Sequence, residues 1–92
     1  TVLSLPVDRA LEVLARAGDT FDLIFLDPPF ADAAAYRRVL DAVAATALLA
    51  PDGVLVAQHD VRLPLPAAAG TLSRTRVQQI GDNALSFYRQ GG

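Results

Sequence analysis

A short apolar run, Leu23–Leu26, ends directly in an aspartate and two prolines. Its apolar residues are contiguous instead of alternating, which is typical of a strand that is buried on both faces, as in a parallel sheet. We therefore predict a β-strand over Asp22–Asp27. Parallel strands need long crossover connections, which are usually helices. The run therefore favours an α/β fold.

The segments on either side alternate between strand and helix patterns. Thr1–Leu5 is short and β-leaning, and Val7–Ala17 has apolar residues at helical spacing. A second helix is predicted over Ala33–Leu49, with Asp32 as its N-cap, and a second buried strand over Gly53–Gln58. Two consecutive strand–helix–strand passages predict an α/β domain with a parallel sheet.

The last third of the chain has a different pattern. A turn is predicted at Pro51–Gly53, and Val61–Gly70 is expected to be a loop with at most one helical turn. Strands over Arg74–Ile80 and Ala84–Arg89 flank a turn at Gly81–Asn83. These two strands are predicted to form a C-terminal antiparallel hairpin.

Composition excludes several classes of site. The chain has 92 residues, enough for one small domain, and it lacks cysteine. Disulfides and thiolate metal sites are therefore excluded, and with His59 as the one histidine we expect no metal site. We find no membrane-spanning run and no signal peptide, so we expect a cytoplasmic protein. The net charge of −2 is not typical of a nucleic-acid-binding domain, so a nucleic-acid enzyme of this charge would need basic surface from elsewhere.

The strand ending is itself a candidate active site. Asp27 would hold a carboxylate at the sheet edge, where α/β folds bind ligands. Pro28 and Pro29 remove two backbone donors and leave carbonyls that can accept hydrogen bonds from a ligand. Phe30 offers a flat face to a planar substrate. We predict that Asp27, Pro28 and Pro29 are catalytic and that Phe30 binds substrate, in methyl transfer to an exocyclic amine. The alternative is that Asp27 caps a turn and Phe30 is a core residue.

Three segments, in this order and spacing, extend the motif to a family resemblance: FDLIFLDPPF, LLAPDGVLVAQHD and IGDNALSFYR. They resemble the C-terminal half of the bacterial small-subunit ribosomal RNA guanine-N2 methyltransferases (the RsmD family), which have the class I S-adenosylmethionine-dependent fold. The resemblance covers nearly the whole chain. The DPPF motif is shared by many amino-methyltransferases, whereas the closing GDNALSFYR segment is more specific to this family.

The resemblance implies roles for individual residues. S-adenosyl-L-methionine would be the cofactor and ribosomal RNA of the small subunit the partner. Asp27 and the Pro28 carbonyl would hold the guanine amine, and Phe30 would stack on the flipped-out base. Val7 and Asp8 lie in the loop that touches the adenine of the cofactor, so both are expected to bind cofactor, as is Asp27. The family often has an acidic residue where this chain has Pro6, and for Asp8 a simple first-turn charge is the alternative.

The resemblance also implies missing parts. The class I fold opens with a strand and a glycine-rich turn, and a second strand follows, but neither has a counterpart here. Residues 1–92 are therefore expected to be the C-terminal part of one methyltransferase domain, a partial Rossmann-like sheet that lacks its first two strands and half of its cofactor pocket. In the family those strands separate the third from the fourth. The Asp22–Leu26 strand should then expose an edge, which predicts a chain that is poorly folded, rearranged or self-associating, and inactive alone.

Two other functions share these features. A DNA adenine amino-methyltransferase also carries DPPF, although the hairpin segment argues against it. An inert fragment or interaction module that binds no cofactor is the non-enzyme alternative.

The remaining polar residues are expected to be structural. His59 is predicted to be a structural or solvent-facing side chain and not a catalytic base. Arginines on the helix after DPPF and later in the chain are assigned to solvated surfaces, with phosphate contact as the alternative. Hairpin residues are assigned to architecture: Asp82, Asn83, Ser86 and Tyr88.

Overall fold

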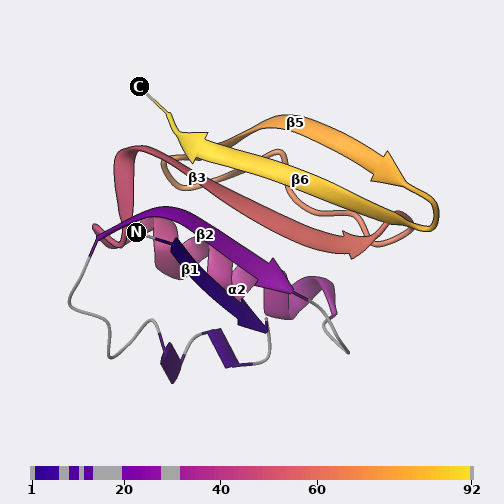
Figure 1. The fold of residues 1–92 in the computed structure, drawn as a ribbon, viewed down its shortest axis with the longest axis horizontal. Coiled ribbons are helices and arrows are strands. Elements are labelled where there is room, and N and C mark those ends of the chain that lie inside the picture. The colour runs from indigo at the N-terminus through magenta and orange to yellow at the C-terminus, as the bar shows by residue number, and fades with distance from the viewer. Residues whose placement is uncertain (1, 7–8, 11, 14–19, 28–31, 92) are drawn as a thin grey trace.

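The fold is a six-stranded mixed sheet with a helix packed on one face (Figure 1). The computed structural model describes residues 2–6, 9–10, 12–13, 20–27 and 32–91. The strand order is β1-β2-β3-β6-β5-β4. The elements are β1 (Val2–Pro6), β2 (Phe21–Asp27), α2 (Ala33–Ala44), β3 (Leu49–Asp60), β4 (Ala68–Ala69), β5 (Leu72–Ile80) and β6 (Asn83–Gln90). Described residues 9–10 and 12–13 are helical.

The first three strands are parallel and the rest are antiparallel. β1 pairs with β2, and β2 with β3, in parallel register. β6 then pairs antiparallel with both β3 and β5. The predicted architecture of parallel strands closed by a C-terminal antiparallel hairpin is therefore confirmed.

The predicted open edge of the Asp22–Leu26 strand is wrong. β1 lies directly beside β2, with Leu5 opposite Leu26, so β2 has a partner strand on each side. Unpaired backbone N–H and C=O groups are costly, and direct pairing of β1 with β2 satisfies them. The outermost parallel strand is thus β1. Self-association of the chain stays a prediction, but its original reason, an open edge on β2, does not hold.

One face of the sheet forms the core. Ile24 and Leu26 of β2 are fully buried on this face, and they belong to the same cluster as the apolar stripe of α2. Side chains alternate across a strand, so the neighbouring residues of β2 point to the other face. That second face stays partly exposed, at Leu23, Phe25, Val54, Leu85 and Phe87.

Helix α2 begins as predicted but ends earlier. The carboxylate of Asp32 caps it by accepting a hydrogen bond from the Ala35 amide at 2.8 Å. The predicted extension to Leu49 is wrong, because the helix ends at Ala44 and β3 begins at Leu49. The Leu48 carbonyl accepts a hydrogen bond from the Phe21 amide at 2.7 Å, which ties this segment to β2 instead.

The turn predicted at Pro51–Gly53 lies inside β3. The register with β2 shifts there, from Phe21 opposite Leu49 to Leu23 opposite Val54. The predicted turn is therefore a local irregularity in the pairing of one continuous strand. A Cβ atom on Gly53 would lie 3.0 Å from the Asp22 carbonyl oxygen, so glycine is needed for this close approach.

The C-terminal hairpin is confirmed, and it is longer than predicted. Ile80 and Asn83 are paired, so the turn consists of Gly81 and Asp82, with Gly81 at a φ of 62°. The loop after β3 contains the two-residue strand β4, which the sequence did not indicate. Leu65 and Ala69 of this segment are buried in the core cluster.

Candidate active site at the carboxyl edge of the parallel strands

The carboxyl ends of β1, β2 and β3 lie at one edge of the sheet, because the three strands are parallel. Asp27 is the last residue of β2 and pairs in register with Pro6, the last residue of β1. Its side chain is partly buried. Among the described residues, no hydrogen bond or ion pair engages its carboxylate. The other predicted site residues lie outside the described residues: Val7, Asp8, Pro28, Pro29 and Phe30.

Tyr36 joins this edge to helix α2. Its hydroxyl donates a hydrogen bond to the backbone carbonyl of Gln58 at 2.5 Å, and its side chain is 1% exposed. Burial, and in second place the negative charge of Asp27, raise the pKa of Tyr36 to about 12. The sequence analysis assigned Tyr36 no role beyond its place in the predicted helix. The residue type alone could have indicated this contact, since a buried tyrosine hydroxyl usually has a hydrogen-bond partner.

His59 is held in place by two hydrogen bonds. Its Nε2 lies 2.7 Å from the Ser86 hydroxyl and its Nδ1 lies 2.9 Å from the Asp60 carbonyl oxygen. A carbonyl can only accept, so Nδ1 donates and Nε2 accepts from the hydroxyl in the neutral ring. The side chain is 4% exposed. The Tyr36 ring lies edge-on to the imidazole, with 6.2 Å between the two ring centroids. The structural interpretation of His59 is confirmed, and its solvent-facing alternative is wrong.

Ser86 and Tyr88 support the core side of the hairpin, as predicted. Ser86 is fully buried beside His59. The Tyr88 hydroxyl donates to the Pro66 carbonyl at 2.7 Å, and burial raises the pKa of Tyr88. Both hydroxyls thus tie the antiparallel part of the sheet to its surroundings.

Charged side chains near this edge are mostly paired or exposed. Arg62 donates to Asp60 through its backbone amide and its guanidinium, which holds the pKa of Asp60 well below its usual range. Arg37 and Arg38 are exposed on α2, as predicted. Arg74 departs from the prediction, because it is partly buried and donates to the Leu65 carbonyl at 3.1 Å.

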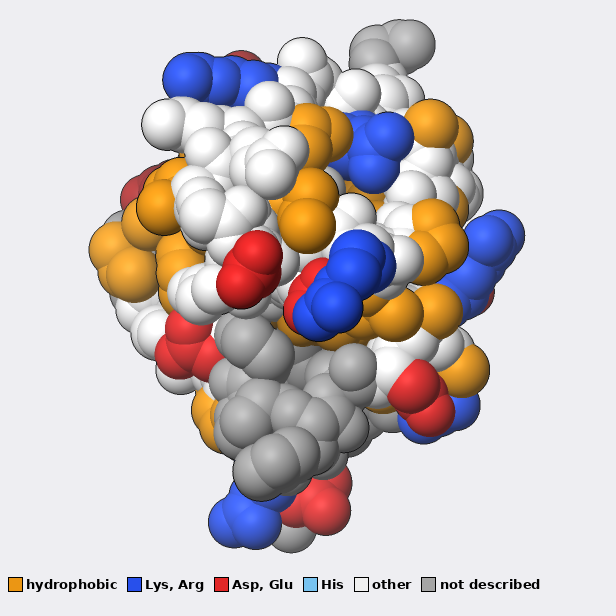
Figure 2. Space-filling view, turned by 90° about the vertical axis from the view of Figure 1, so that its right-hand side faces the viewer, with side chains coloured by type: hydrophobic (Ala, Val, Ile, Leu, Met, Phe, Trp, Pro, Cys, Tyr) orange, Lys and Arg blue, Asp and Glu red, His pale blue; other side chains and the backbone are white. Residues whose placement is uncertain are grey.

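Figure 2 shows the end of the molecule at which strands β1, β2 and β3 end. Acidic and basic side chains are interspersed on the face shown, with hydrophobic side chains between them. Among the described side chains on this face, neither sign of charge predominates, so these residues form no basic field of the kind that attracts nucleic acid from a distance.

Among the described residues, no group of three or more His, Asp or Glu side chains could hold a metal ion. In the same part of the chain, no helix has the length and apolar character needed to span a bilayer.

The shifted pKa of Tyr36 predicts a loss of stability in alkali. The folded-state pKa of about 12 lies above the value of about 10 for a free phenol, so the unfolded chain loses its proton first. The free energy of unfolding should therefore fall as the pH rises from about 10 to about 12. Urea denaturation at several pH values measures this fall.

The variant Tyr36→Phe isolates this contribution. It should lower the free energy of unfolding at neutral pH by about 1–3 kcal/mol, because the partly buried Gln58 carbonyl loses its donor. It should also flatten the alkaline slope, while Tyr88 continues to contribute. An unchanged slope in Tyr36→Phe, together with a loss in Tyr88→Phe, would contradict the assignment to Tyr36.

Comparison with known sequences identifies the family. Residues 2–89 match the family described as conserved hypothetical protein 95 (Cons_hypoth95). YlbH of Bacillus subtilis (strain 168), whose name is "Putative rRNA methyltransferase YlbH", is 33% identical over 85 residues. That match covers 92% of this chain and 46% of YlbH, so the chain spans about half the length of this curated relative.

Solved structures show the same fold. A conserved hypothetical protein from Streptococcus pyogenes has a TM-score of 0.72 at 26% identity, over 89% of this chain and 50% of its own. A putative methylase from Haemophilus influenzae has a TM-score of 0.71 at 20% identity, over 90% and 52%. The second likeness shows the fold alone, which is a class I methyltransferase-like fold. The chain therefore belongs to the conserved hypothetical protein 95 family, the RsmD-type family of methyltransferases.

Proposed function

We propose that the protein is an S-adenosylmethionine-dependent methyltransferase of ribosomal RNA, and that its target is the exocyclic N2 amine of a guanine in the small-subunit RNA. The observation that carries the proposal is the Asp27 carboxylate, partly buried at the carboxyl end of β2 and unengaged by the other described residues. Family membership and the name of YlbH support the class of reaction and of substrate. A ribosomal RNA substrate implies a cytoplasmic location.

Asp27 would act by positioning the amine. The lone pair of an exocyclic amine is delocalised into the base, which makes the nitrogen a poor nucleophile. A carboxylate that accepts one N–H, with the Pro28 carbonyl accepting the other, favours a tetrahedral nitrogen. Its lone pair then points out of the plane of the base and is no longer delocalised into the ring. The gain is one of orientation and electrostatics. Pro29 would keep the segment rigid and Phe30 would stack on the extruded base.

The described residues fit the cofactor in position and charge. The adjacent ends of β1 and β2, at Pro6 and Asp27, lie where open α/β sheets bind ligands. The carboxylate of Asp27 suits a positively charged sulfonium compound. When bound, S-adenosylmethionine supplies an electrophilic methyl group. We assign Val7, Asp8 and Asp27 to holding it.

A chimera tests the proposal. The matched 85 residues of YlbH are replaced by the equivalent part of this chain, and the chimera is incubated with methyl-labelled S-adenosylmethionine and undermodified small subunits. We expect label in RNA at a single guanine, as N2-methylguanine. Residues 1–92 alone, run in parallel, should transfer little, since they correspond to about half of YlbH.

The outcomes separate the alternatives. In a parallel incubation with unmethylated DNA, label in adenine together with none in the RNA would support the DNA adenine methyltransferase. A chimera that binds S-adenosylmethionine in calorimetry but labels neither nucleic acid would contradict the proposed substrate. A folded chimera that binds no cofactor would support an inert interaction module.

A further inference from the structure

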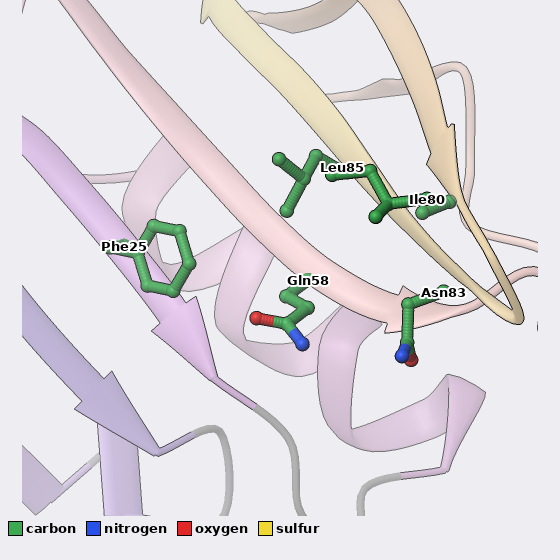
Figure 3. A pocket seen from close by; sticks show the side chains of 6 residues that line it. Phe25, Gln58, Ile80, Asn83 and Leu85 are labelled. Atoms are coloured by element: carbon green, nitrogen blue, oxygen red, sulfur yellow. The ribbon is translucent and has the colours of Figure 1, made fainter.

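A pocket of about 240 Å³ lies on the sheet face opposite α2, near the carboxyl edge. Ile24 and Leu26 are buried toward the helix, so Phe25 between them points to the other face. The pocket extends from β2 across β3 to the hairpin (Figure 3). Its described lining residues are Phe25, Gln58, Ile80, Asn83, Ala84 and Leu85.

The lining combines apolar walls with two carboxamides. The side chains of Gln58 and Asn83 engage in no hydrogen bond with any described residue, so within this part of the chain each carboxamide keeps a donor and an acceptor for a ligand. Figure 3 shows the Gln58 carboxamide between the Phe25 ring and Asn83. None of the described lining side chains is charged. Such a lining suits a neutral, flat ligand with a hydrogen-bonding edge.

Size and position restrict the ligand further. The volume is below the roughly 300–1,000 Å³ of sites for drug-sized ligands, which favours a single ring system. Phe25 and Asp27 are two residues apart on β2, roughly 7 Å along the strand and on the same face. A base seated against Phe25 could therefore present an amine to Asp27.

We propose that this pocket is a nucleobase site in which Gln58 and Asn83 read the hydrogen-bonding edge of a guanine. The carboxamide oxygen of Gln58 can accept from guanine N1–H, the carboxamide nitrogen of Asn83 can donate to O6, and the Phe25 ring packs against the base. The inference rests on the proposed function, because Asp27 receives the remaining edge of the same base. It makes Gln58 and Asn83 specificity-determining residues.

Titration of residues 1–92 with guanosine monophosphate, followed by NMR, tests the site without cofactor or turnover. We expect the side-chain amide signals of Gln58 and Asn83 to shift with guanosine monophosphate, to shift less with adenosine monophosphate, and to stay fixed with ribose phosphate. Each of Gln58→Leu and Asn83→Leu should weaken guanosine monophosphate binding about tenfold. Gln79→Leu is the matched control, since Gln79 is exposed and precedes Ile80, so its side chain points to the opposite face.

Two results would overturn the inference. Equal affinity in Gln58→Leu, Asn83→Leu and Gln79→Leu would mean that the carboxamides read no base. Shifts that ribose phosphate alone reproduces would mean that the phosphate is bound. A chimera that methylates RNA but is insensitive to Gln58→Leu would refute the base site alone, whereas guanosine monophosphate binding without methyl transfer would refute the proposed reaction alone.

Discussion

Replacing Asp27 with alanine should lower methyl transfer by the YlbH chimera by roughly 100-fold or more. The reason is that the carboxylate is proposed to hold the amine in its reactive geometry, and the loss of one such preorganised group typically costs this much in kcat. The affinity for S-adenosylmethionine should fall much less, because Val7 and Asp8 are also assigned to holding the cofactor. Single-turnover assays give the rate, and calorimetry gives the cofactor affinity.

Two further variants make this test specific. Asp27→Asn keeps one acceptor oxygen and the shape of the side chain, so its rate should lie between those of wild type and Asp27→Ala. Asp52→Ala removes an exposed carboxylate near the opposite end of β3 and should leave the rate unchanged. Turnover that survives in Asp27→Ala, or that falls equally in Asp52→Ala, would refute the role assigned to Asp27.

The same variants carry an internal check of folding. The negative charge of Asp27 contributes to the raised pKa of Tyr36, so Asp27→Asn should lower that pKa while burial keeps it above the ordinary value. Phenolate absorbance during an alkaline titration measures this. A change there with unchanged near-ultraviolet circular dichroism would show a local effect in a folded chain.

Leu40→Ala should lower the free energy of unfolding by about 2–5 kcal/mol. Leu40 is fully buried on the face of α2 that packs with the core cluster of the sheet, so truncation removes apolar contacts and leaves a cavity. Small domains are stable by only about 5–15 kcal/mol, so this is a large share of the total. Urea denaturation of the two proteins measures the difference.

Arg38→Ala is the control in the same helix. Arg38 is exposed, and truncation of an exposed side chain usually changes stability by less than about 0.5 kcal/mol. If Leu40→Ala and Arg38→Ala destabilise equally, α2 does not pack against the sheet as described.

The sequence was most informative where one segment determines its own structure. The contiguous apolar residues of β2 and the turn residues Gly81 and Asp82 are local signals, and both elements were predicted. The end of α2 could not be predicted in the same way, since alanines and leucines continue the helical pattern to Leu49. What ends the helix is pairing of this segment with Phe21, a contact between residues far apart in the chain.

The candidate site shows the same division. Asp27 was identified from its motif and its place at a strand end. Tyr36 was missed as a residue of this edge, because its partner, the Gln58 carbonyl, comes from another element. Direct pairing of β1 with β2 was also not predicted, since the resemblance implied a strand order with two further strands between them.

The environment of His59 gives the protein a built-in spectroscopic label. The chain has one histidine, so the imidazole ring produces a single set of carbon-bound proton signals, with none from a second histidine. That ring is enclosed by Tyr36 from α2 and Ser86 from β6 while belonging to β3. Its chemical shifts therefore report, in one observation, whether these three elements are assembled around the carboxyl edge of the sheet.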